Sequence, residues 1–96
     1  MMKEFLPIGT VVNLNQAEEY NFMIIGLLVE NTQNERRDYV AVRYPVGAMG
    51  NAKYYFFNNE NIKEVVHMGY VNDDHKTYAE LLNSVEKQIN MQSNKQ

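Results

Sequence analysis

The most constraining feature of this sequence is a run of four consecutive aromatic residues, Tyr54 to Phe57. Aromatic side chains favour a pleated strand over a helix interior. Because successive side chains of a strand point to opposite faces, Tyr54 and Phe56 share one face, and Tyr55 and Phe57 share the other. Both faces are therefore aromatic, although a small domain buries only one face of such a strand in its core. The other face needs a cover, which is either the C-terminal helix or a partner.

The size and composition of the chain exclude several classes of protein. Its 96 residues predict a single domain spanning residues 1–96. It has no cysteine, which excludes disulfides, thiolate zinc sites and thiol nucleophiles. The net charge of −3 provides no electrostatic drive toward nucleic acid, so we expect no nucleic-acid partner.

No segment of the sequence resembles a membrane span or a signal peptide. The longest apolar stretch, Phe22 to Val29, is too short to cross a bilayer. The amino end, Met1 to Pro7, lacks the apolar region of a signal peptide. We therefore expect a cytoplasmic protein with no membrane partner.

Short apolar runs separated by polar turns predict about five strands before residue 70. We expect these strands at residues 10–14, 22–30, 38–44, in the aromatic run, and at 64–68. The polar residues 15–21 are predicted to be a loop, and residues 58–61 a single helical turn. In the third strand, Val40, Val42 and Tyr44 alternate with Tyr39, Ala41 and Arg43, so one face is more apolar than the other. Gly26, in the middle of the second strand, indicates a bulge or a sharp bend.

After Gly69 the apolar spacing changes to that of an amphipathic helix, predicted over residues 73–90. Asp73 or Asp74 would cap this helix at its amino end. Its apolar stripe, expected to pack against the sheet as core, consists of Tyr78, Leu81, Leu82, Val85 and Ile89. The polar tail, residues 91–96, is expected to be frayed.

Together these elements predict an α+β fold. Short loops between strands favour antiparallel pairing, since parallel neighbours need long crossovers. We expect a small, strongly curled antiparallel sheet of about five strands over residues 5–70, similar to an SH3-like half-barrel. One C-terminal amphipathic helix follows it.

Several segments, in matching order, resemble a family of small bacterial proteins known as domain of unknown function 4176. These segments are Leu6–Val12, Met23–Gly26, Asp38–Val40, Tyr44–Gly47, Tyr55–Asn58, Ile62–Val66 and Gly69–Tyr70. The resemblance covers most of the chain. It implies a genomic setting beside LXG-type toxins of the type VII (ESAT-6-like) secretion system. It also implies an accessory protein or chaperone in the cytosol that holds such a toxin before export.

The residues that could bind a metal or take part in catalysis are better explained as ordinary structural or surface residues. His67, Asp73, Asp74 and His75 match no metal-ligand spacing, so we expect no metal site. No Ser, Thr or Lys lies in a nucleophile-elbow or phosphate-loop context. We therefore expect no catalytic residue, no cofactor and no enzymatic activity.

The candidate protein-binding residues are Tyr44, Met49, Tyr54 and Phe56, which surround the loop between the third and fourth strands. Tyrosine and methionine are enriched at protein–protein interfaces. Two alternatives stay open for the outward aromatic face: cover by the C-terminal helix, or an interface with a partner. The helix stripe could also be the binding surface.

The leading functional hypothesis is a cytosolic chaperone or adaptor for an LXG-type toxin. The expected partner is therefore a secreted toxin or a related secretion-system protein, and the free chain is expected to be a monomer or weak homodimer. One alternative is an immunity protein that blocks a toxin domain. An alternative from another class of function is a small β-barrel that binds single-stranded RNA by stacking its bases on Tyr54 and Phe56. The acidic net charge of the chain argues against this alternative.

Overall fold

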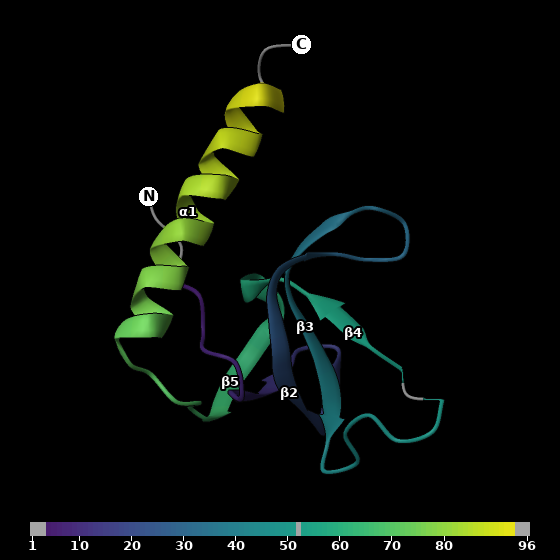
Figure 1. Ribbon diagram of the computed structural model, residues 1–96. Coiled ribbons are helices and arrows are strands. Elements are labelled where there is room, and N and C mark those ends of the chain that lie inside the picture. The colour runs from purple at the N-terminus through teal and green to yellow at the C-terminus, as the bar shows by residue number, and fades with distance from the viewer. Residues whose placement is uncertain (1–3, 52, 94–96) are drawn as a thin grey trace. The chain divides into compact units, whose positions relative to one another are not determined.

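The computed structural model describes residues 4–51 and 53–93, in an α+β architecture (Figure 1). Its elements are β1 (Val11–Leu14), β2 (Ala17–Glu30), β3 (Arg36–Tyr44), β4 (Tyr55–Phe57), the 3₁₀ helix η1 (Asn59–Asn61), β5 (Ile62–His67) and α1 (Asp73–Ser93). Residues 6–70 form one compact unit that contains the sheet. The second compact unit contains Phe5 and α1. The predicted five-stranded antiparallel sheet and single C-terminal helix are confirmed.

The sheet is antiparallel throughout, in the order β4-β3-β2-β1-β5. The first four strands are joined in sequence as hairpins, since their connections are too short for parallel crossovers. After β4 the chain passes through η1 and crosses to the opposite edge of the sheet, where β5 pairs with β1. The two edges of the sheet are therefore β4 and β5.

The predicted loop at residues 15–21 is wrong, because β2 begins at Ala17. Only Asn15 and Gln16 form the turn between β1 and β2. The side-chain nitrogen Nδ2 of Asn13 donates hydrogen bonds to the backbone carbonyls of Glu18 (2.8 Å) and Tyr20 (2.9 Å), which fixes this end of β2. The prediction failed because residues 18–20 are exposed and lack the apolar alternation of a half-buried strand.

The core of the sheet lies on the face of β3 that carries Tyr39 and Ala41, both of which are completely buried. On the opposite face, Val42 is buried but Tyr44 is exposed. The other buried apolar residues of this unit are Val11, Val12, Phe22, Ile24, Leu27 and Phe57. The strand prediction was correct, and the face that forms the core is set by the side of β3 that the aromatic residues of β2 and β4 occupy.

The predicted irregularity at Gly26 is confirmed as a β-bulge. The register of β2 against β3 shifts between Ile24, opposite Ala41, and Gly26, opposite Val40, which leaves Ile25 as the extra residue. A Cβ atom added to Gly26 would lie 2.7 Å from Cγ1 of Val40. A side chain at this position would therefore force the Val40 side chain or the strand to shift.

We expect Gly26→Val to lower the free energy of unfolding by about 1–3 kcal/mol, despite the higher strand propensity of valine, because overpacking forces the strands apart. Chemical denaturation measures this loss. A matched test places Gly26→Ala in a Val40→Ala background, where the loss should be smaller than in the wild-type background. A Gly26→Val protein as stable as wild type would contradict the role of the bulge.

Helix α1 begins where the sequence predicted, but a different residue caps it. The side-chain oxygen of Asn72 accepts a hydrogen bond from the backbone nitrogen of His75 at 3.1 Å, so the capping side chain is Asn72 rather than Asp73 or Asp74. The two aspartates instead occupy the first turn, where they complement the helix dipole. The helix continues to Ser93, three residues beyond the predicted end, and residues 94–96 of the expected tail lie outside the described residues.

The apolar stripe of α1 is buried at one position only. Leu82 is 7% exposed, whereas Leu81 is 55% exposed and Val85 is also exposed. The packing of this stripe against the sheet stays a prediction. No helix in the described ranges is both long and apolar enough to cross a membrane.

Candidate functional site

Strand β4 is short and is held at the sheet edge by aromatic packing. It pairs with β3 through only three residues, with Phe57 opposite Tyr39 and Tyr55 opposite Ala41. The ring of Tyr55 lies 4.9 Å from that of Phe22, and the ring of Phe57 lies 5.6 Å from that of Tyr39. These contacts bury Phe57 and leave Tyr55 half-buried. The aromatic run therefore anchors one face of β4 into the core.

A polar network determines where β4 ends and the chain turns away. Asp38 is buried, and its Oδ2 accepts a hydrogen bond from the backbone nitrogen of Asn59 at 2.9 Å. The backbone nitrogen of Asp38 donates to the side-chain oxygen of Asn58 at 2.9 Å. The hydroxyl of Tyr39 donates to Oδ1 of Asn59 at 2.6 Å and accepts from the backbone nitrogen of Leu6 at 3.0 Å. β3 thus holds the turn that directs the chain away from the outer edge of β4.

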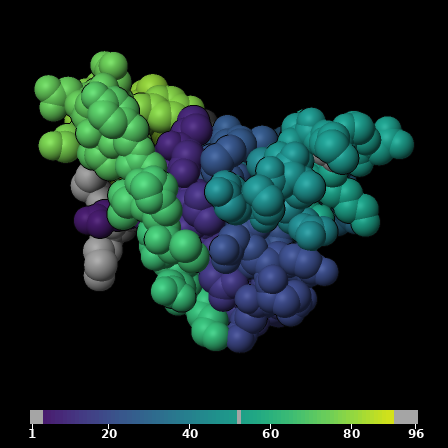
Figure 2. Space-filling model, turned by 90° about the horizontal axis from the view of Figure 1, so that it is seen from below, coloured from purple at the N-terminus to yellow at the C-terminus, as the bar shows by residue number. Residues whose placement is uncertain are grey.

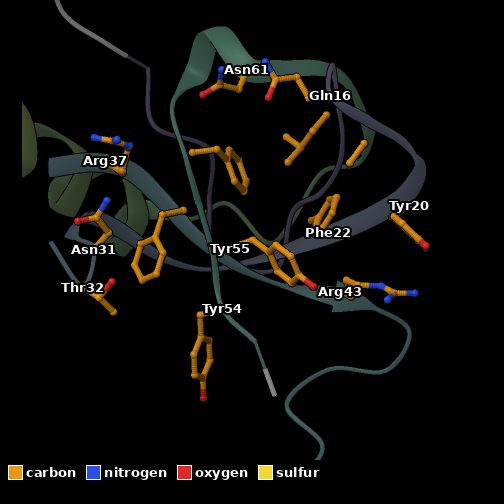
Figure 3. Close-up of a pocket in the computed structure, with 14 residues that line it drawn as sticks. Gln16, Tyr20, Phe22, Asn31, Thr32, Arg37, Arg43, Tyr54, Tyr55 and Asn61 are labelled. Carbon is orange, nitrogen blue, oxygen red and sulfur yellow. The ribbon is translucent and has the colours of Figure 1, made fainter. Parts of the chain in front are cut away.

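An open cavity of about 730 Å³ surrounds β4 (Figure 3). Its lining residues are Leu14, Gln16, Ala17, Tyr20, Phe22, Asn31, Thr32, Arg37, Arg43, Tyr54, Tyr55, Phe56, Phe57 and Asn61. In the view of Figure 3, Tyr55, Phe22 and Arg43 lie on one side of β4. Asn31, Thr32 and Arg37 lie on its other side. Six of these lining residues are aromatic and six are polar or charged.

The cavity follows the free edge of β4, as the pattern of its lining residues indicates. All four consecutive residues from Tyr54 to Phe57 contribute to it. Alternate side chains of a strand point to opposite faces, so a cavity on one face alone would contact only every second residue. The cavity therefore extends over both faces, along the edge to which no strand pairs in the described part of the sheet. Such an edge presents backbone donors and acceptors to an incoming chain.

A second, smaller cavity of about 360 Å³ lies beside the first. Arg43, Val46, Gly47, Met49, Lys53 and Tyr55 line it. Its lining comes largely from the loop between β3 and β4, which stands out from the sheet as the teal projection in Figure 2. Arg43 and Tyr55 belong to both cavities, so the two form one continuous surface, which we call the β4 surface.

The four sequence-predicted binding residues fall at different places on this surface. Tyr54, which is 52% exposed, and the half-buried Phe56 line the larger cavity. Met49 is 73% exposed and lines the smaller one. Tyr44, although 56% exposed, lines neither. The structure therefore brings together three of the four and separates Tyr44 from them.

Sequence reasoning missed Tyr20 and Arg43. The guanidinium carbon of Arg43 lies 4.0 Å from the centre of the Tyr20 ring, a cation–π contact that forms one wall of the larger cavity. Tyr20 had been assigned to a loop, and the contact depends on the register of β2 against β3. The signal in the sequence that could have identified Arg43 was its position two residues beyond Ala41, on the same face of β3.

The structure describes all four residues considered as metal ligands. His67, Asp73 and Asp74 are exposed, and Nε2 of His75 lies 3.1 Å from the backbone oxygen of Phe5. Across residues 4–51 and 53–93, no group of three or more His, Cys, Asp or Glu is placed to hold an ion.

We expect elemental analysis of the purified protein to find no stoichiometric transition metal. His67→Ala combined with His75→Ala should leave partner binding unchanged, because neither imidazole lines the β4 surface. About one bound ion per chain, lost in this double variant, would contradict the expectation.

Comparison with known proteins places the chain in a family but assigns no activity. The sequence model of the family described as Domain of unknown function (DUF4176) matches residues 5–78. No curated protein and no solved structure matches the chain. The match covers the sheet, the β4 surface and the first turns of α1.

Proposed function

The chain belongs to the DUF4176 family, and we propose that it is a non-catalytic protein-binding module that holds an extended segment of a partner at the β4 edge. The observation that carries this proposal is the contribution of four consecutive residues to one cavity along an unpaired strand edge. Added strands gain affinity from backbone hydrogen bonds and specificity from side-chain pockets. The β4 surface offers both.

The composition of the β4 surface supports a protein partner. Tyrosine, phenylalanine, methionine and arginine, the residue types enriched at protein interfaces, make up half of its lining. Tyr54 and Met49 are large, exposed and close to the strand edge, as interface anchors are. A partner segment lying on this surface would cover apolar area on both molecules that otherwise promotes association.

The partner proposed is an LXG-type toxin of the type VII secretion system, held in the cytoplasm before export. This choice of partner rests on what the resemblance described in the sequence analysis implies. In this role the module acts as a chaperone or adaptor: it masks an exposed segment of the toxin until the secretion machinery takes it over. No chemical step is required of the chain.

An SH3-like half-barrel is the proposed form of the sheet. The strand order, with β5 beside β1 and a helical turn before β5, supports this form. So does the larger cavity, because Leu14 and Gln16, beside the β1–β2 turn, and Asn61 in η1 line it together with β4. Strong curvature would bring these parts of the sheet around one concave surface.

The experiment is co-expression of the full chain with a tagged toxin from the neighbouring gene, divided into its targeting region and its toxin domain. We expect the chain to co-purify with the targeting region. Capture by the toxin domain alone would instead support an immunity protein. Failure of both fragments to retain the chain would contradict the proposal.

A further inference from the structure

The charged residues of the β4 surface all have the same sign. Arg37 and Arg43 line the larger cavity, and Lys53 joins Arg43 in the smaller one. Among the residues that the structure describes, no acidic side chain lines either cavity, although the whole chain carries a net charge of −3. The β4 surface is therefore a basic and aromatic region of an acidic protein, and its charge is complementary to an anionic ligand.

The two arginines of the larger cavity differ in their partners. Arg37 is engaged: its Nη2 lies 3.3 Å from a carboxylate oxygen of Glu35, and its Nη1 donates to the backbone oxygen of Arg36 at 2.9 Å. Arg43 has no ion pair within residues 4–51 and 53–93, and its buried Nε–H has no acceptor there. Because Nε is buried, a carboxylate in the cavity would meet the terminal Nη N–H groups of Arg43, which lines both cavities and has no competing ion pair in these ranges.

The position of Arg43 is fixed before any ligand binds. Its guanidinium carbon lies 4.0 Å from the centre of the Tyr20 ring, and Arg43 as a whole is half-buried in β3. A planar guanidinium held on an aromatic ring keeps its remaining N–H groups in a fork that matches the two oxygens of a carboxylate. Little conformational entropy is then lost when the carboxylate binds.

We propose that Arg43 and Tyr20 form a specificity pocket for an aspartate or glutamate side chain of the segment that adds to the β4 edge. This inference rests on the proposed function, whose partner it describes more closely. A single unpaired arginine suits one carboxylate. A nucleic-acid strand needs a row of cations along its backbone, and the net charge of −3 opposes it.

The test is selection of random peptides displayed on phage against the purified full chain, followed by affinity measurement on a selected synthetic peptide. We expect aspartate or glutamate to be enriched at one fixed position among alternating apolar residues. Replacing that acid by its amide should weaken binding to the wild-type chain by about tenfold or more. The same replacement should change binding to Arg43→Gln less than about twofold, because the partner of the carboxylate is already missing.

Arg37→Gln is the matched control, since Arg37 lines the same cavity but already has partners. It should retain the preference for the acid, whereas Arg43→Lys should retain it only in part because lysine lacks the planar fork. Unchanged melting transitions establish that each variant is folded.

Three outcomes would overturn this inference. The first is that the selection yields no peptide, or only peptides without an acid at a fixed position. The second is that the Arg43→Gln variant still prefers the acid over its amide. The third is that the chain binds a short oligouridylate and loses this binding in Arg43→Gln. The co-expression experiment distinguishes failure of the acidic pocket from failure of the proposed function. If the toxin is captured equally by wild type and Arg43→Gln, only the acidic pocket is wrong; if the toxin is not captured at all, the proposed function fails.

Discussion

Tyr39→Ala is expected to lower the free energy of unfolding by about 3–5 kcal/mol, as truncations of buried aromatic residues do. Tyr39 has no exposed surface and packs its ring against Phe57. Its hydroxyl also joins β3 to η1 through Asn59 and to the amino-terminal segment through Leu6. The total stability of a small domain is about 5–15 kcal/mol, so this loss is a large part of it.

Tyr39→Phe is the matched control, because it keeps the ring and removes only the hydroxyl. It should cost about 1–2 kcal/mol through the loss of two hydrogen bonds. Urea denaturation measures both variants. Equal losses for the two would show that the hydrogen bonds, and not the packing of the ring against β4, fix this part of the sheet.

Tyr54→Ala is expected to weaken toxin binding by about 30-fold, the effect of losing roughly 2 kcal/mol at an interface anchor. Tyr54 is exposed at the start of β4 and lines the larger cavity. Since it is not part of the core, the melting transition should stay close to that of wild type. Isothermal titration calorimetry with the captured toxin fragment measures the change.

Tyr44→Ala controls for the general loss of an exposed tyrosine, because Tyr44 is equally exposed but lines neither cavity. It should weaken binding much less than Tyr54→Ala. If Tyr54→Ala binds at wild-type strength while a folded Val85→Asp variant does not, the binding surface is α1 and the sheet is only its scaffold.

The sequence predicted most of the fold because its local signals were strong. The apolar run around Gly26 predicted β2 and its bulge, and the change of period after Gly69 predicted α1. The errors lie where local signals are weak. The exposed start of β2 at Ala17 has no apolar alternation, and the cap Asn72 was passed over for the aspartates that follow it.

The site was less accessible to sequence reasoning because it depends on register. The aromatic run identified Tyr54 and Phe56 as candidates, and local alternation placed them on one face of a strand. The cavity follows the edge of β4 because β4 is an outer strand of the sheet. No single segment of the sequence determines that position. The contact between Tyr20 and Arg43 likewise depends on the pairing of β2 with β3.

Hydrogen–deuterium exchange of the chain, with and without its captured partner, tests most directly whether the β4 edge is the binding surface. An added strand would pair with the open edge, so the backbone amides of residues 54–57 should exchange more slowly in the complex. Residues of β5, at the opposite edge, should be unaffected and serve as an internal control. Protection confined to β5 or to α1, with unchanged exchange in β4, would contradict binding at the β4 edge.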